Sequence, residues 1–366
     1  MERTIRHAVI AAVLLAGALW ALASAGAEDR RGRYPNAGLL ADAPWLHRHM
    51  QDEDVVIVDV RTDEHFDGRL IPGAIRMPWS LFRENDLASG TAERFVGITR
   101  SEQVLGSHGI GRTSRVVLYD SQERDGGATA SYVFWVLDVL GHPRKTVLER
   151  GIEAWEEAGH DLDSRPKELS PVLYPAPLED IDRTALIEGE FVYRRLGDPY
   201  YQIIDVRSPE EYRGAKKSRG LRGDDLKTGH IPTAVNVDYR NNWVDGAEKR
   251  LRPYRELQEL YRGLDPDRGV IVYCDSGRRS SFSYFVLRLM GIDDVRTYEA
   301  SWQEWGQPGK FFPVETQARG FNTQDLPGTS RAGGRGAASS PQNGRREAAS
   351  GSTGTTAAGG YVSCGG

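Results

Sequence analysis

The chain is poor in cysteine: only Cys274 and Cys364 occur among its 366 residues. Two cysteines exclude a multi-disulfide scaffold and a zinc site made of cysteines alone. A basic charge excess is also absent, because the formal net charge is -5 at pH 7. That balance argues against a partner nucleic acid. Each thiol is therefore either incidental or kept for chemistry.

Long apolar runs are absent except at the N-terminus. There Arg3 and Arg6 precede an uncharged run over 8–22, and small residues over 23–27 offer cleavage sites. This order is typical of an export signal, so we expect residues 1–27 to be a signal peptide and the protein to be periplasmic or secreted. The alternative is an uncleaved anchor helix, since the run approaches the roughly 20 residues that span a bilayer. Membrane association is expected only in that case.

The sequence contains an internal repeat. Two β-branched runs end in Asp-Val-Arg, at 55–61 and 201–207, and each leads into an acidic, aromatic segment. Both halves continue with an Ile-Pro turn, a second apolar run, a helical segment and a Trp-bearing helix. Alternation of this kind predicts an α/β fold in which mainly parallel sheets are flanked by helices. We therefore expect two domains of one fold.

Composition marks the limits of the repeated units. We expect the first domain over 38–163, a proline-rich linker over 164–182 and the second domain over 183–313. Beyond that point Gly, Ala and Ser dominate, and large apolar residues are rare. Such a segment does not bury enough surface to offset its ordering entropy, so 314–366 is predicted to be a disordered tail.

Cys274 is the candidate catalytic residue. It follows an apolar run over 269–273, and a short polar loop connects it to a helical segment. Backbone N–H groups of such a loop, together with the positive end of the helix dipole, favour a thiolate or an added anion. The alternative is a core cysteine that ends a strand. The loop consists of Asp275, Ser276, Gly277, Arg278 and Arg279.

The spacing of the loop arginines separates two chemistries. A phosphate-cleaving cysteine loop of the tyrosine-phosphatase kind has arginine six positions after the cysteine, where this chain has Ser280. Here Arg278 and Arg279 lie four and five positions on. The loop is one residue too short for that pattern and fits an anion built around sulfur better than a phosphate ester.

With these features the chain resembles the tandem-domain rhodanese (thiosulfate/3-mercaptopyruvate sulfurtransferase) family. The resemblance covers about 38–313 and rests on the two Asp-Val-Arg runs, the Gly-His-Ile-Pro turn at 229–232, the loop over 274–279 and the Trp-bearing closing helices. It implies two rhodanese-like domains, of which the first is inactive and carries Asp120 in the cysteine position.

The resemblance also implies a mechanism. The Cys274 thiolate takes the outer sulfur of a small sulfur-containing anion, and the resulting persulfide passes it to a thiophilic acceptor such as cyanide, a thiol or a protein cysteine. No metal or organic cofactor is required. Arg207 is expected to help bind the substrate anion, together with the loop residues 275–279; an ion pair of Arg207 with Asp205 or Glu211 is the alternative.

Two departures from the family's loops leave the donor preference open. Asp275 and Arg279 replace residues of the usual thiosulfate-preferring and mercaptopyruvate-preferring patterns. The alternative hypothesis for the function is an exported, non-catalytic module that binds a sulfur anion or docks a redox partner. The retained Cys274 favours the enzyme.

Other residues receive weaker assignments. Cys364, near the end of the tail, is either an incidental thiol or a relay partner of Cys274 that takes sulfur from it or forms a reversible disulfide with it. His230 is expected to fix the Gly-His-Ile-Pro turn rather than to act as a base or ligand. The charged, glycine-containing segment over 213–227 is expected to be an exposed insertion beside the active site.

Overall fold

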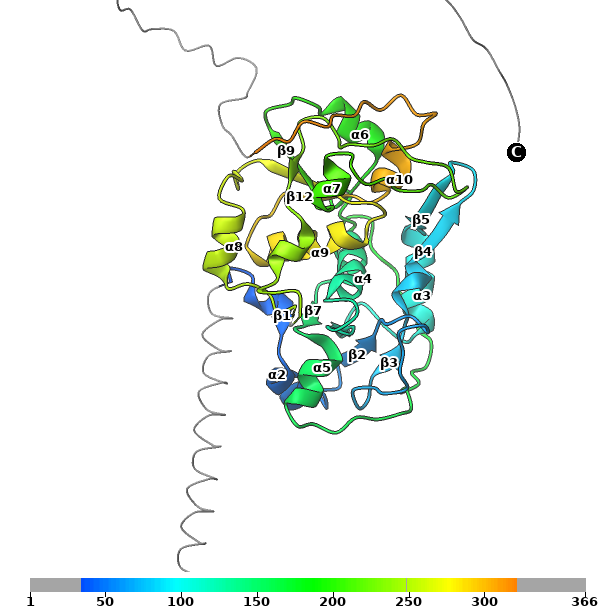
Figure 1. Ribbon diagram of the computed structural model, residues 1–366. Coiled ribbons are helices and arrows are strands. Elements are labelled where there is room, and N and C mark those ends of the chain that lie inside the picture. The colour runs from blue at the N-terminus through cyan, green and yellow to red at the C-terminus, as the bar shows by residue number, and fades with distance from the viewer. Residues whose placement is uncertain (1–33, 248, 321–366) are drawn as a thin grey trace, which may run out of the picture. The chain divides into compact units, whose positions relative to one another are not determined.

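The computed structural model describes residues 34–320 except residue 248. The predicted signal peptide, most of the predicted tail and Cys364 therefore lie outside the described residues. Over the described range no helix is both long enough and apolar enough to cross a membrane. The chain folds there into two α/β units, which follow one another in sequence (Figure 1).

The first unit is built on a parallel sheet with the strand order β1-β7-β6-β2-β3. The sheet strands are β1 (Leu40–Ala41), β2 (Val55–Asp59), β3 (Ile75–Arg76), β6 (Arg115–Tyr119) and β7 (Lys145–Leu148). The helices are η1 (Ala37–Leu39), α2 (Ala43–His49), η2 (Trp79–Phe82), α3 (Ile98–Ser107), α4 (Ala128–Val139) and α5 (Gly151–Glu157). Strands β4 (Arg83–Asp86) and β5 (Thr91–Phe95) form a separate antiparallel hairpin.

The second unit has a parallel sheet with the order β10-β9-β11-β12-β8. Its strands are β8 (Leu186–Ile187), β9 (Tyr201–Asp205), β10 (Val235–Asn236), β11 (Gly269–Tyr273) and β12 (Val295–Tyr298). Its helices are α6 (Gly189–Arg194), α7 (Pro209–Tyr212), η3 (Tyr239–Asn242), α8 (Tyr254–Leu260), α9 (Arg278–Leu289) and α10 (Ser301–Trp305).

The two sheets have the same topology. Counted from the β3 edge of the first sheet and the β10 edge of the second, corresponding strands of the two repeats occupy the same positions. Strands β6 and β11 each lie between two neighbours, and their β-branched side chains are almost entirely buried, as expected for strands covered on both faces. The predicted α/β fold with parallel sheets flanked by helices is confirmed.

Helices α4 and α9 join the two units. They lie side by side in Figure 1, and Phe134 and Phe285 meet edge to face with ring centroids 5.1 Å apart. The Tyr284 hydroxyl donates to Asp138 at 2.7 Å. One continuous cluster of buried apolar side chains includes residues of both units. The repeated units therefore share a core.

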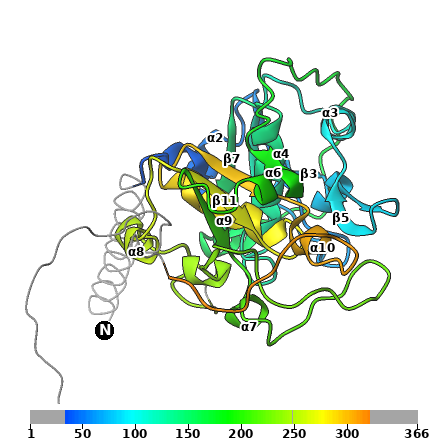
Figure 2. The ribbon, with the colours of Figure 1, turned by 90° about the horizontal axis from the view of Figure 1, so that it is seen from above.

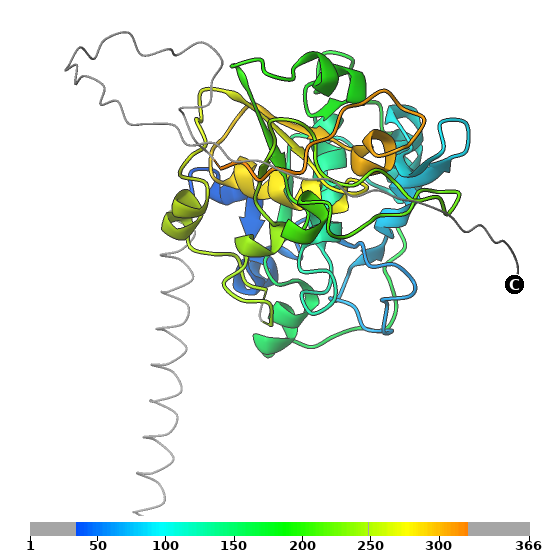
Figure 3. The ribbon, with the colours of Figure 1, turned by 45° about the horizontal axis from the view of Figure 1, so that its top comes forward.

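The β4–β5 hairpin of the first unit reaches the second unit. It lies beside α10 in Figure 1, Figure 2 and Figure 3. Gln307 donates to the Thr91 hydroxyl at 3.2 Å, and Arg222 donates to the Leu87 carbonyl at 3.3 Å near the hairpin tip. Arg222 belongs to the segment 213–227, so this segment contacts the hairpin. Arg83 and Glu93 of the hairpin also hydrogen-bond to Ser276, so the hairpin places side chains of the first unit beside the Cys274 loop.

Candidate active site

Cys274 lies between the end of β11 and the start of α9. Its N–H donates to the Ser301 hydroxyl at 3.0 Å, and its carbonyl accepts from the N–H of Trp302 at 3.2 Å. The hydrogen bond from Ser281 to the Gly277 carbonyl, at 2.9 Å, closes the first turn of α9. The backbone N–H groups of the residues before Ser281 belong to the loop and to the start of α9. The first N–H groups of a helix have no partner within the helix. Cys274 therefore precedes a helix start whose N–H groups are suited to an anion.

Gly277 gives the loop its shape. Its φ is +87°, a value that side-chain-bearing residues rarely adopt. A Cβ at this position would lie 3.0 Å from Cγ of Glu299, whose carboxylate accepts from the Tyr132 hydroxyl and the Phe95 N–H. The position is therefore restricted to glycine by its backbone angle and by the buried side chain behind it.

Cys274 lines a pocket of about 310 Å³ although it is only 1% exposed. Four of the five loop residues line this pocket too, whereas Gly277 lies against Glu299 instead. Three further lining residues come from the first unit and were not found by the sequence reasoning: Trp79, Arg83 and Glu93. They carry no motif: Arg83 and Glu93 reach the loop through the docking of the hairpin, and Trp79 lies in η2, directly before the hairpin.

Arg279 is held by Glu211, which lies in α7, the short helix after β9. Two guanidinium nitrogens donate to the carboxylate at 2.8 and 3.0 Å, and Ser208 and Glu211 form a capping box at the start of α7. Burial would lower the pKa of Arg279, but the hydrogen bonds to Glu211 and the negative charges of Cys274 and Glu211 raise it above its ordinary value. Arg279 thus stays cationic in the loop that follows Cys274.

Arg278 faces the first unit. Its guanidinium lies 3.7 Å from the buried carboxylate of Asp125, which also lies 3.4 Å from Nδ1 of His65. Burial raises the pKa of Asp125, and the charges of His65 and Arg278 oppose that shift. Arg278 therefore connects the Cys274 loop to the corresponding loop of the first unit.

Asp275 is turned partly toward α10. Its carboxylate accepts from the Gln303 side chain at 3.1 Å, and its backbone carbonyl accepts from the Gln303 N–H at 2.9 Å. Gln303 thereby holds one carboxylate oxygen of a residue that lines the pocket.

Ser276 is bound by the hairpin. Its hydroxyl donates to the Glu93 carboxylate at 2.8 Å, and its carbonyl accepts a short hydrogen bond from Arg83. Arg83 and Glu93 also pair with each other at 3.2 Å. The loop that carries Cys274 is therefore fixed from both units of the chain.

Arg207 lies outside the lining of this pocket. It is buried in an ion pair with Asp205 at 2.7 Å, donates to the Gly229 carbonyl at 2.7 Å and lies over the Trp302 ring at 4.1 Å. Arg61 makes the same ion pair with Asp59 in the first unit, which has no cysteine at this place. The structure thus contains the ion pair that the sequence left open as the alternative to substrate binding, and Glu211 pairs with Arg279 instead.

Asp120 occupies the position in the first unit that Cys274 has in the second. It follows β6, and its carboxylate accepts from the N–H groups of Gly127, Thr129 and Ala130 at 3.0–3.2 Å. Burial and the charge of Asp125 raise the pKa of Asp120 to about 7. The donors at the start of α4 therefore hold a carboxyl group where the second unit holds the thiol.

His230 is a turn residue. It is fully buried, its Nδ1–H donates to the Tyr212 carbonyl at 2.8 Å, and its ring stacks on Tyr212 with centroids 3.7 Å apart. Within residues 34–320, residue 248 aside, no three His, Cys, Asp or Glu side chains gather as metal ligands would.

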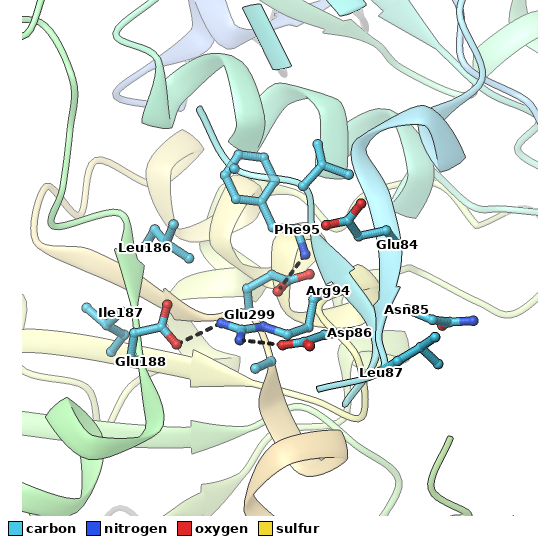
Figure 4. Close-up of a pocket in the computed structure, with 13 residues that line it drawn as sticks. Glu84, Asn85, Asp86, Leu87, Arg94, Phe95, Leu186, Ile187, Glu188 and Glu299 are labelled. Atoms are coloured by element: carbon cyan, nitrogen blue, oxygen red, sulfur yellow. Dashed lines mark hydrogen bonds and ion pairs between the residues drawn. The ribbon is translucent and has the colours of Figure 1, made fainter. Parts of the chain in front are cut away.

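A larger cavity of about 570 Å³ lies on another part of the same hairpin. Figure 4 shows Arg94 there between Glu188, at 2.9 Å, and Asp86, at 3.4 Å. Neither Arg94 nor its two partners line the Cys274 pocket. Neighbouring hairpin residues thus belong to different cavities.

Comparison with known proteins identifies the family of the chain. A model of the rhodanese-like domain matches the chain twice, over residues 42–158 and 189–308. The chain belongs to the rhodanese family and contains two rhodanese domains. Sulfur transfer is the general chemistry that its named relatives support.

Three relatives span most of the chain. A putative thiosulfate sulfurtransferase of Saccharopolyspora erythraea is 31% identical over 276 residues, which cover 73% of this chain and 93% of the relative. A thiosulfate sulfurtransferase of Corynebacterium glutamicum is 29% identical, with coverages of 80% and 94%. A sulfur carrier protein of Thermus thermophilus is 28% identical, with coverages of 75% and 95%.

Solved structures share the fold. The anaerobic ergothioneine biosynthesis enzyme of Chlorobium limicola superposes with a TM-score of 0.64 at 20% identity, over 77% of this chain and 71% of that enzyme. At this identity the likeness concerns the fold.

Proposed function

We propose that the protein is a sulfurtransferase that moves sulfane sulfur from thiosulfate, or from 3-mercaptopyruvate, through a persulfide on Cys274. The observation that carries the proposal is the place of Cys274: it lines an open pocket beside the start of α9, with Arg83, Arg278 and Arg279 around it. The full-length relatives named thiosulfate sulfurtransferase support the same chemistry.

The first half-reaction loads the cysteine. The Cys274 thiolate attacks the outer sulfur of thiosulfate, a sulfur–sulfur bond forms, and the bond to the inner sulfur breaks with its electron pair, so that sulfite leaves. With 3-mercaptopyruvate the carbon–sulfur bond breaks, and pyruvate leaves after its carbon is protonated. The N–H groups of the loop and of the helix start stabilise the anionic persulfide.

The second half-reaction unloads it. A thiophilic acceptor attacks the outer sulfur of the persulfide, and the electron pair of the sulfur–sulfur bond returns to Cys274 as a thiolate. Cyanide would give thiocyanate, and a thiol or a protein cysteine would give a new persulfide. Neither half-reaction requires a metal or an organic cofactor.

A transfer assay tests the proposal. Purified protein should form thiocyanate from thiosulfate and cyanide, and Cys274→Ser should abolish the reaction while its far-UV circular dichroism stays unchanged. Transfer that survives in Cys274→Ser would overturn the assignment. Thiosulfate binding by the intact protein without any turnover would support the non-catalytic module instead. A comparison of thiosulfate with 3-mercaptopyruvate then identifies the preferred donor.

Two further proposals rest on the sequence. Export on a signal peptide over 1–27 predicts a mature N-terminus near residue 28 in a periplasmic or extracellular fraction; N-terminal sequencing of the native protein tests it.

The relay predicts that sulfur passes from Cys274 to Cys364. Mass spectrometry after thiosulfate treatment should then find a persulfide on Cys364 or a disulfide between the two residues. A persulfide on Cys274 alone would contradict the relay.

A further inference from the structure

We propose that two residues of the first domain set the substrate preference of the Cys274 pocket: Arg83 binds the anionic group of the donor, and Glu93 competes with that group for Arg83. The inference rests on the proposed sulfur transfer and extends it, because it assigns the domain that lacks the cysteine a direct part in binding.

The three guanidinium groups of the pocket are not equally available. Arg279 forms two hydrogen bonds with Glu211, whose side chain is 5% exposed, and Arg278 faces Asp125, whose side chain is 1% exposed. Removing Arg279 would leave the buried Glu211 carboxylate without its hydrogen-bonded cation, which is costly. Removing Arg278 would take from the buried Asp125 one of the cations that offset its burial, the others being His65 and Lys249. These two arginines are therefore committed to the protein.

The ion-pair partner of Arg83 is different, although the charge of Arg83 also acts on the buried carboxylate of Glu299. Glu93 lies 3.2 Å from Arg83, but its side chain is 56% exposed. Water screens such a pair, and a carboxylate that leaves it is readily solvated. A donor anion that enters the pocket can therefore take over Arg83 more easily than either of the other two arginines.

Arg83 is already held in position. Its side chain is only 6% exposed, its Nε donates to the Glu93 carbonyl at 2.9 Å, and its guanidinium lies over the rings of Trp79 and Tyr132 at 4.6 and 5.2 Å. It also donates to the Ser276 carbonyl, in the loop after Cys274. A charge fixed in this way binds an anion without first losing rotamer freedom.

Glu93 is held at the pocket as well. Its backbone has a φ of +56°, which is uncommon for a residue with a side chain, and its N–H donates to the Asn85 side chain at 3.0 Å. Its carboxylate accepts from the Ser276 hydroxyl. The negative charge thus stays near Arg83 and disfavours a dianion, whereas an uncharged acceptor is little affected.

Steady-state kinetics with thiosulfate test the two roles with opposite expected signs. Arg83→Gln should raise KM about tenfold or more and change kcat less, as expected for the loss of a charged hydrogen bond. Glu93→Gln should lower KM about two- to fivefold, the range of an exposed ion pair. In the double variant, Glu93→Gln should have no effect. Arg94→Gln, on the same hairpin but outside this pocket, is the matched control and should leave KM unchanged.

Binding measurements separate this inference from the proposed function. Calorimetric titration of thiosulfate into Cys274→Ser protein, with and without Arg83→Gln or Glu93→Gln, requires no sulfur transfer. The same opposite shifts in Kd should appear there. Equal KM and Kd in wild type and Glu93→Gln, or a loss confined to kcat in Arg83→Gln, would overturn the inference even when the wild-type enzyme is active. A wild-type protein that binds thiosulfate but transfers no sulfur would refute only the proposed function.

Discussion

Arg279 and Glu211 form a two-point ion pair that joins the Cys274 loop to the segment after β9. Arg279 is one of the two loop residues that depart from the family's usual patterns. In this chain the charge of Arg279 is paired with Glu211 of the same unit. Glu211 lies in the acidic segment that follows the second Asp-Val-Arg run. The departure is therefore part of the architecture of the loop.

Breaking that pair should destabilise the protein. Arg279→Gln leaves the Glu211 carboxylate buried without its cation, and we expect the free energy of unfolding to fall by about 2–3 kcal/mol. Urea denaturation measures it. The control is Arg262→Gln, which breaks an exposed pair with Glu259 and should cost less than about 1 kcal/mol. Equal losses in both variants would contradict the prediction.

The same pair predicts a pH dependence. Burial would raise the pKa of Glu211, but the hydrogen bonds and charge of Arg279 lower it to about 2 from an ordinary 4.5. A carboxyl whose pKa is lowered by folding stabilises the folded state above its unfolded pKa and loses that contribution as protons bind. The stability difference between wild type and Glu211→Gln should therefore shrink as the pH falls from about 4.5 to 2. A difference that stays constant over this range would count against the assignment.

Asp120 should change the free energy of unfolding with pH in the opposite direction. Its pKa is raised to about 7 from an ordinary 3.8, so the folded state binds its proton more tightly than the unfolded state. Its ionisation then opposes folding, and its contribution to stability declines as the pH rises from about 4 to 7. Asp120→Asn should remove this decline, which thermal denaturation at a series of pH values would detect. Parallel pH profiles for wild type and variant would exclude the shift.

Gly277→Ala should impair catalysis. The new Cβ would sit at a φ of +87° and 3.0 Å from Glu299, so the loop has to move away from its present path. We expect kcat for thiosulfate:cyanide transfer to fall at least tenfold, because small displacements of reacting groups cost about a hundredfold in rate. Gly197→Ala is the control, since Gly197 has a φ of +76° but nothing within 4 Å of its Cβ position. A similar loss in both variants would show that backbone strain alone is responsible.

The sequence predicts the elements whose pattern is local. The runs at 55–61 and 201–207 form β2 and β9 with the residues that follow them, and Cys274 ends β11 beside a helix start. The same local pattern could not assign Arg207, because Asp-x-Arg spacing allows both an internal ion pair and an arginine that faces the substrate. Only the surroundings decide between them, and here these are Asp205, the Gly229 carbonyl and the Trp302 ring.

The hairpin contribution could not be predicted in that way. The residues of β4 and β5 are mostly charged or polar, and they show no strand alternation that marks a buried face. Their position depends on the packing of two units whose contact surfaces are distant in sequence. Arg83 and Ser276, which share a hydrogen bond, are separated by almost two hundred positions.

The core shared through α4 and α9 has a consequence for how the two halves fold. Each half repeats a complete sheet, yet each exposes apolar helix surface when the other is removed. Cutting the gene between the repeats should yield fragments that aggregate or need each other to become soluble, and the intact chain should melt in one cooperative step. The two copies that the sequence displays should therefore fold as a single cooperative unit.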